Sequence, residues 1–178
     1  MKKIVLILSI TSLIAYVTTS AVSVSTVPST ENREKDSPEL KWYTDFTQAY
    51  ELSQKTGKPI FGFFTGSDWC GWCKRLQANV FAKDDFKKWA DESVILLELD
   101  FPRRTQLPPK TMQQNRELAQ LFKVKGYPTV WIFNSSKDPK TNQMSINALG
   151  SLGYPRADAG KEAEKFIADA NRIIANKK

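Results

Sequence analysis

The sequence predicts an α/β domain in which a central mixed sheet of four to five strands is flanked by helices. Short apolar runs typical of buried strands alternate with segments whose apolar residues recur every three or four positions, as in amphipathic helices. Such alternation favours parallel strands connected by helices that pack on the faces of the sheet. Near the carboxyl end, two strand-like runs follow each other across one polar segment, which indicates an antiparallel hairpin and therefore a mixed sheet.

The first half of the domain contains two strand–helix pairs. A short strand at 40–43 precedes a helix that Thr44 or Asp45 is expected to cap. The aromatic-rich run at 59–65 is almost continuously apolar, which is typical of a strand covered on both faces. A second helix begins near Cys70. The residues expected on its inward face are Cys73, Leu76 or Gln77, and Val80.

The second half is predicted by the same periodicities. Closely spaced prolines make 101–109 a loop, because proline removes a backbone donor and disfavours helix before it. A polar turn at 134–142 separates the two strands of the hairpin. The expected elements are a helix at 83–90, a strand at 94–100, a helix at 110–122, strands at 130–133 and 144–149, and a helix at 161–176.

The amino-terminal end has the pattern of a secretory signal peptide. Two lysines precede an apolar run at 4–17, and the small residues Thr19 and Ala21 suit a cleavage site. A helix over this run would rise about 21 Å, short of a hydrocarbon core of about 30 Å, so cleavage is favoured over an anchor. Membrane contact is expected only through this segment, if it is not cleaved. The domains expected are a signal peptide at 1–21, a flexible linker at 22–39 and a folded domain at 40–178.

The composition excludes several kinds of chemistry. The chain has no histidine, which excludes Ser-His-Asp and Cys-His catalysis and histidine-containing zinc sites. Its formal net charge is +7, but a lysine-rich surface is more often a solvated face than a nucleic-acid groove, so no nucleic acid is expected as a partner. No cofactor and no metal are expected.

The only two cysteines form the motif Cys70-Gly71-Trp72-Cys73. At a helix start, this spacing places two sulfurs within disulfide reach, the first near the positive end of the helix dipole. A disulfide that spans two residues constrains little of the unfolded chain, so it is a poor structural crosslink. We therefore expect the pair to cycle between dithiol and disulfide. A static disulfide, a Cu(I) site and half of a zinc site remain the alternatives.

Two motifs together resemble the thioredoxin superfamily. A strand leads into Trp-Cys-x-x-Cys-Lys at a helix start, and Gly-Tyr-Pro-Thr at 126–129 opens a later strand. Within this superfamily, the segments 64–73, 100–103 and 153–154 are similar to those of exported bacterial thioredoxin-like disulfide reductases. The resemblance covers residues 40–176 and implies a thioredoxin fold.

The resemblance also implies roles for individual residues. Cys70 would attack a substrate disulfide, and Cys73 would resolve the mixed disulfide. Pro128 would be a cis-proline. The residues expected to contact the substrate are Trp69, Gly71, Trp72, Tyr127 and Pro128.

One position departs from the pattern of the superfamily. Phe64 stands six residues before the first cysteine, where many thioredoxins carry a buried aspartate. The proton acceptor for Cys73 is therefore open, with Glu98, Asp100 and water as candidates, while Asp68 is expected to cap the helix.

The expected activity is the reduction of protein disulfides. No histidine lies between the cysteines, and Asp68 disfavours a thiolate on Cys70, which makes the reduced form less stable and the protein more reducing. The partners expected are disulfide-containing exported proteins and a membrane thiol reductase as electron donor, in the periplasm. The alternatives are a disulfide oxidase or isomerase, and a thioredoxin-fold binding or chaperone module without catalysis.

Overall fold

The computed structural model describes residues 38–176, so the expected signal peptide and most of the expected linker lie outside the described residues. The strands are β1 (Trp42–Tyr43), β2 (Ile60–Thr65), β3 (Ile95–Asp100), β4 (Thr129–Lys137) and β5 (Met144–Leu152). The helices are α1 (Phe46–Thr56), α2 (Gly71–Leu76), α3 (Asp84–Ser93), α4 (Pro109–Leu121) and α5 (Glu162–Ala175). A π-helical turn, η1 (Gln77–Phe81), continues α2.

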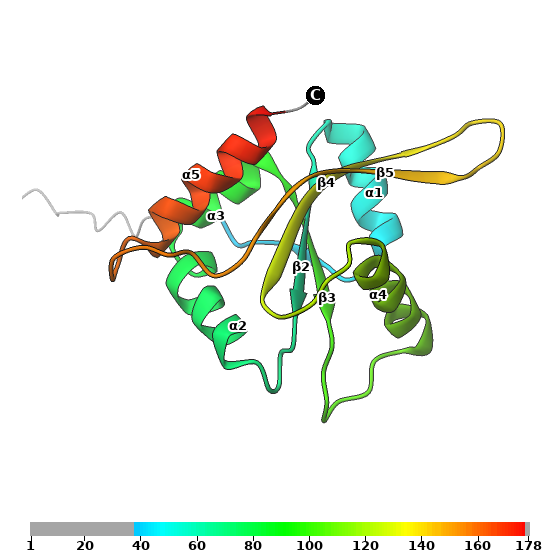
Figure 1. Ribbon diagram of the computed structural model, residues 1–178. Coiled ribbons are helices and arrows are strands. Elements are labelled where there is room, and N and C mark those ends of the chain that lie inside the picture. Colours follow the sequence, from blue (N-terminus) through cyan, green and yellow to red (C-terminus); the bar gives the residue numbers. More distant parts are fainter. Residues whose placement is uncertain (1–37, 177–178) are drawn as a thin grey trace, which may run out of the picture. The chain divides into compact units, whose positions relative to one another are not determined.

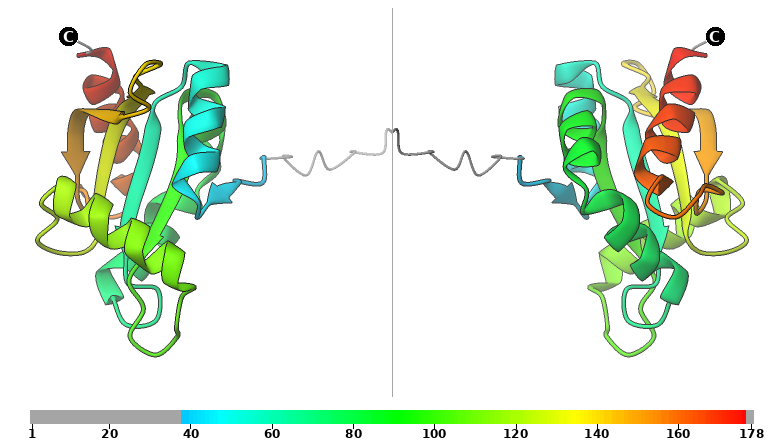
Figure 2. Two further views of the ribbon diagram at one scale, coloured as in Figure 1. Left: turned by 90° about the vertical axis from the view of Figure 1, so that its right-hand side faces the viewer. Right: turned by 90° about the vertical axis from the view of Figure 1, so that its left-hand side faces the viewer.

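The strands form one mixed sheet in the order β1-β3-β2-β4-β5. β3 pairs in parallel with both β1 and β2, whereas β4 pairs antiparallel with β2 and with β5. Helices α2, α3 and α5 cover one face of this sheet, and α1 and α4 cover the other (Figures 1 and 2). The mixed, helix-flanked sheet predicted from the sequence is confirmed.

The central strand β2 is buried along its whole length, as its continuous apolar run predicts. Successive side chains point to opposite faces, so β2 contributes to two hydrophobic cores. The core under α2, α3 and α5 is aromatic and includes Phe61, Phe63, Phe81, Phe86 and Phe166. The core under α1 and α4 includes Ile60, Phe64, Leu97, Leu99 and Phe133.

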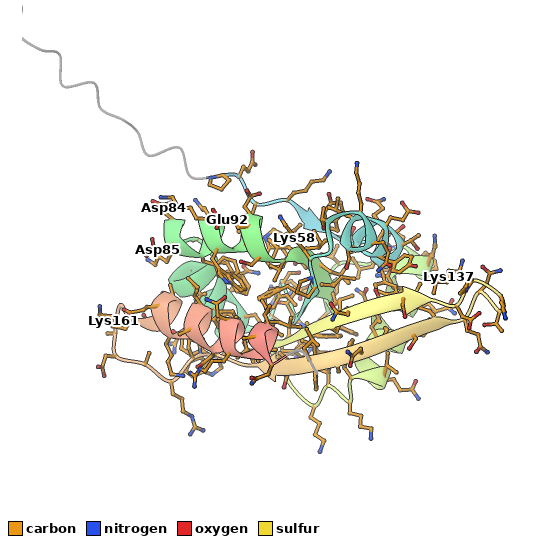
Figure 3. All side chains as sticks on the ribbon, turned by 90° about the horizontal axis from the view of Figure 1, so that it is seen from above. Lys58, Asp84, Asp85, Glu92, Lys137 and Lys161 are labelled. Atoms are coloured by element: carbon orange, nitrogen blue, oxygen red, sulfur yellow. A yellow bond between two sulfur atoms is a disulfide. The ribbon has the colours of Figure 1, made fainter. Side chains whose placement is uncertain are left out.

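The ends of the helices follow ordinary capping chemistry. Asp45 is the N-cap of α1, where its side chain accepts a hydrogen bond from the Thr47 N–H at 2.7 Å. Gly57 ends this helix in the left-handed region at φ 72°, which a glycine adopts without steric cost. Asp84 and Asp85 lie in the first turn of α3, where the helix dipole favours negative charge (Figure 3).

The hairpin of β4 and β5 is longer than expected, so the predicted turn at 134–142 is wrong in extent. β4 continues to Lys137 and β5 to Leu152, and Asn134 pairs with Asn147 in the ladder. The Asp138 carboxylate accepts hydrogen bonds from the Lys140 and Thr141 N–H groups at 2.7 and 2.8 Å, which confines the turn to the tip. The hairpin runs out beyond the other strands (Figure 1). Both faces of the hairpin tip are exposed, so its sequence has no alternation of apolar and polar residues that would predict strands there.

Within residues 38–176, no helix combines the length and the apolar character that a membrane crossing requires.

Candidate active site

The two cysteines lie where the turn after β2 becomes helix α2. The Trp69 and Cys70 N–H groups donate to the Gly66 carbonyl at 3.2 and 2.8 Å, which turns the chain back toward the sheet. Cys70 is the N-cap of α2, and its Sγ accepts a hydrogen bond from the Cys73 N–H at 3.2 Å. The helix therefore starts where the sequence predicts.

Cys70 and Cys73 are joined by a disulfide, with their Cα atoms 5.3 Å apart. Cys70 is 5% exposed, whereas Cys73 is fully buried in the aromatic core. The two sulfurs are thus not equivalent, because only Cys70 combines some solvent access with a position at the helix N-terminus.

The loop that follows β3 is held against the cysteine turn by two aspartates, and the two segments lie side by side at the lower end of Figure 1. Asp100 accepts hydrogen bonds from the Ser67 N–H at 2.8 Å and from the Ser67 Oγ at 2.6 Å. Asp68 accepts from the Arg103 N–H at 3.1 Å and from the Arg104 N–H at 2.6 Å. The expectation that Asp68 caps α2 is therefore wrong, because its carboxylate faces these two backbone amides instead.

These amides also set the charge of Asp68. The hydrogen bond from the Arg103 N–H, with smaller contributions from the next two residues, holds the pKa of Asp68 below its ordinary value of 3.8. The carboxylate is therefore ionised at neutral pH, next to the cysteine turn.

Trp69 and Tyr127 form one side of the site. The indole N–H of Trp69 donates to the Phe101 carbonyl at 2.8 Å, and its ring meets Tyr127 edge to face with centroids 5.7 Å apart. Gly66 makes room for this indole, since a Cβ there would lie 2.4 Å from a Trp69 ring atom. The Tyr127–Pro128 peptide bond is cis. Burial raises the pKa of the Tyr127 phenol above 10, so this group stays neutral at physiological pH.

Trp72 forms a second aromatic side. Its side chain is 54% exposed, meets Tyr154 with ring centroids 5.1 Å apart, and lies under the Arg75 guanidinium at 4.7 Å. The Tyr154 hydroxyl accepts a hydrogen bond from Asn79 at 2.8 Å. Gly71 is exposed, with open space where a Cβ would stand. Trp72 and Gly71 thus give the cysteine turn exposed apolar surface and free volume.

Of the seven predicted site residues, the five at 69–73 lie in the cysteine turn and the start of α2. The other two, Tyr127 and Pro128, lie in the loop before β4, and Tyr127 contacts Trp69. Sequence reasoning did not assign roles to Phe101, Tyr154 and Arg75. The first two lie in the segments 100–103 and 153–154 that carried the family resemblance, which was the available signal. Arg75 follows a helical spacing with Trp72 that also suits an exposed helix face.

The candidate proton acceptors are placed differently from one another. Phe64 lies on the opposite face of the sheet, where its ring packs on Phe122. Glu98 pairs with Phe63 on the face that α2 covers, and it lines a surface hollow with Gln77 of η1. The Asp100 carboxylate is bound by Ser67. Of the two remaining carboxyl candidates, Glu98 is the one without such a partner in the described chain.

Glu98→Gln is expected to stabilise the protein at neutral pH. Burial, and secondarily the charge of Asp100, raise the pKa of Glu98 above 4.5. The favourable contribution of the protonated form is complete below the unfolded pKa and is lost as pH rises through the folded pKa. Glutamine stays neutral at every pH, so the gain in stability should appear at pH 7, where Glu98 is charged, and vanish near pH 4. It should stay below about 1 kcal/mol, because the carboxyl still contacts water.

Thermal unfolding of both proteins at the two pH values measures this difference. The matched control is Glu92→Gln, on the exposed side of α3 (Figure 3). An equal gain from Glu98→Gln at both pH values would contradict the assignment.

Paired cysteines at the start of a helix, on a sheet of this order and direction, define the class of thiol–disulfide oxidoreductases with a thioredoxin fold. Comparison with known proteins gives the family. Residues 41–135 match the thioredoxin-like family, and the chain belongs to it. The predicted fold and family resemblance are thereby confirmed.

The chain is similar to two proteins of Chlamydia pneumoniae. It is 34% identical over 115 residues to disulfide bond reductase DsbH, covering 65% of this chain and 68% of DsbH. It is 26% identical over 133 residues to the thioredoxin-related protein DsbJ, covering 75% of this chain but 36% of DsbJ. The solved structure of a DsbH oxidoreductase matches with a TM-score of 0.67 and 26% identity, over 83% of this chain and 92% of that chain. The chain is a thiol–disulfide oxidoreductase of the DsbH and DsbJ type.

Proposed function

We propose that the chain is an exported reductase of protein disulfides that acts through Cys70 and Cys73. The difference between the two sulfurs supports this most directly: Cys70 caps the helix and keeps 5% of its surface exposed, whereas Cys73 is fully buried. An accessible sulfur that attacks, followed by a protected sulfur that resolves, is the arrangement that disulfide exchange needs. The name of the similar protein DsbH, a disulfide bond reductase, supports the same direction.

The reaction proceeds in two exchanges. The Cys70 thiolate attacks one sulfur of the substrate disulfide, whose S–S bond breaks as the Cys70–substrate bond forms. Cys73 then attacks the Cys70 sulfur and releases the second substrate sulfur. Two electrons pass to the substrate, and the two protons of the dithiol end on the two substrate thiols. The Cys70–Cys73 disulfide of the structure is the product state, which a membrane thiol reductase would return to the dithiol.

The aromatic residues serve as the contact surface for the substrate in this proposal. Trp69 precedes Cys70 in the chain and contacts Tyr127, and the exposed Trp72 lies between the two cysteines in the sequence. Large, stiff aromatic rings bury apolar substrate surface at low cost in conformational entropy. The backbone next to Pro128 lies beside Trp69 through Tyr127, where it can pair with an extended substrate chain.

Export and compartment follow from the amino-terminal sequence. We propose that residues 1–21 direct secretion and that the domain at 40–178 acts in the periplasm. An oxidising compartment supplies disulfide-containing proteins as substrates. Deleting residues 2–21 should then shift the protein from the periplasmic to the cytosolic fraction.

A redox titration decides the direction of the reaction. Because no histidine lies between the cysteines, we expect a potential nearer to about −270 mV than to about −120 mV, and accelerated reduction of insulin by dithiothreitol. The control is the protein with both cysteines replaced by serine. A potential near about −120 mV would instead favour an oxidase. Failure to accelerate insulin reduction would favour a binding or chaperone module.

A further inference from the structure

A cavity of about 440 Å³ lies between the loop after β3 and the start of α4. The residues that matter in its lining are Asp100, Phe101, Arg103, Leu107, Met112 and Arg116. The charged residues in this lining are Asp100, Arg103 and Arg116.

The cavity shares its wall with the active site. The Phe101 carbonyl accepts the indole hydrogen bond of Trp69, and the Phe101 ring lies 5.3 Å from that of Tyr127. The Arg103 guanidinium lies 3.8 Å from the centroid of the Trp69 ring. A substrate chain that reaches Cys70 along Trp69 therefore passes the two residues that line the near side of the cavity.

The charge on this wall is positive. Within residues 38–176, neither Arg103 nor Arg116 forms an ion pair. Asp100 also lines the cavity, but its two carboxylate oxygens accept hydrogen bonds from Ser67. The carboxylate of Asp68 is likewise occupied by backbone amides. The cavity thus offers two cationic groups and no carboxylate without a partner.

Stacking on Trp69 does not use up the binding capacity of Arg103. The guanidinium carbon lies over the Trp69 ring, and a cation–π contact of this kind does not itself occupy the N–H donors of an arginine. A planar guanidinium with free N–H groups binds a carboxylate through two parallel hydrogen bonds. The tryptophan also restricts the arginine side chain, so less entropy is lost when it binds.

The remaining lining is apolar. Phe101, Leu107 and Met112 are each partly buried, so part of each side chain faces open space. A lining that is half apolar and carries two unpaired guanidinium groups matches a peptide segment with an acidic residue beside an apolar one.

We propose that this cavity binds an acidic segment of the substrate protein next to its disulfide, with Arg103 and Arg116 pairing with carboxylates. The inference rests on the proposed function and names the class of substrate that the same site selects. Arg103 and Arg116 are specificity residues in this scheme and take no part in sulfur exchange.

Three peptides of equal length and with the same internal disulfide test the proposal. They carry glutamate, glutamine or lysine at the flanking positions, next to a leucine. Wild-type protein should reduce the glutamate peptide with a kcat/KM about three- to tenfold above that of the glutamine peptide at low salt. The lysine peptide should be slowest, and raising the salt should shrink all three differences.

The double variant Arg103→Gln/Arg116→Gln should reduce the glutamate and glutamine peptides at equal rates, because its kcat/KM for the glutamate peptide loses the advantage of about three- to tenfold. Arg104→Gln is the matched control. Arg104 lies in the same loop and keeps its backbone bond to Asp68, but its side chain contacts neither Trp69 nor the cavity. Its preference for glutamate should remain.

A cysteine-free glutamate peptide separates this inference from the proposed function. It should bind the oxidised wild-type protein and bind the double variant more weakly, as measured by calorimetry. If it binds in this way but no peptide is reduced, the reductase proposal fails and the acidic subsite stands. Equal rates on all three peptides with no binding, or an equal loss of preference in Arg104→Gln, would overturn the subsite.

Discussion

Replacing Cys73 with serine is expected to trap substrate proteins as mixed disulfides, whereas replacing Cys70 with serine is expected to trap none. Both variants should lose disulfide reduction on the order of a thousandfold or more. The reason is the difference in access: Cys70 is the N-cap of α2 and keeps some solvent exposure, whereas Cys73 is fully buried. Without Cys73, the exchange stops after the first step, and the substrate stays attached to Cys70.

Non-reducing gels of a periplasmic extract, followed by mass spectrometry, detect the trapped species. The double variant Cys70→Ser/Cys73→Ser is the control for disulfides formed by other routes. If Cys70→Ser traps substrates through Cys73 as well as or better than Cys73→Ser does through Cys70, the roles assigned to the two sulfurs are reversed. The sequences of the proteins identified by mass spectrometry show whether acidic residues lie near their cysteines.

Phe61→Ala is expected to destabilise the oxidised protein by about 3–5 kcal/mol. Phe61 is fully buried in β2 at the centre of the aromatic core. Its ring centroid lies 5.8–6.2 Å from those of Trp42, Phe81, Phe86, Trp89 and Phe166. Truncation removes these contacts and leaves a cavity that rings held from several elements cannot fill.

Urea unfolding followed by circular dichroism measures this loss, with both proteins kept oxidised. Leu121→Ala on α4 is the control, because a side chain that is 56% exposed should cost only about 0.5 kcal/mol. A loss below about 1.5 kcal/mol for Phe61→Ala would show that the surrounding rings close the cavity.

The elements that the sequence predicts well are those whose cause is local. Continuous apolar residues at 59–65 predict a buried central strand, and the structure contains it as β2. Asp45 caps α1 because a short acidic side chain reaches the nearby amides. Cys70 starts α2 for a similarly local reason, since its sulfur accepts from the Cys73 N–H. The two-residue spacing of the cysteines is also a local signal, and it predicts the two sulfurs as the centre of the site.

The features that the sequence does not predict depend on contacts between distant segments. Asp68 looks like a helix cap by its position, but it binds amides of the loop after β3. Arg103 looks like a solvated loop residue, and only the fold places it over Trp69. The extent of the β4–β5 hairpin is also missed, because an exposed ladder needs no apolar periodicity.

The hydrogen bonds that Asp68 accepts from the loop amides also determine how acidic a solution the contact withstands. A pKa below 3.8 means that the stabilising contribution of this carboxylate is complete above the unfolded value and is lost only as pH falls through the lower folded value. The contact between the cysteine turn and the loop bearing Arg103 should therefore persist at about pH 5. A protein that acts outside the cytosol, as we propose for this one, is exposed to changes in external pH. Asp68 would keep the substrate-facing loop in place there.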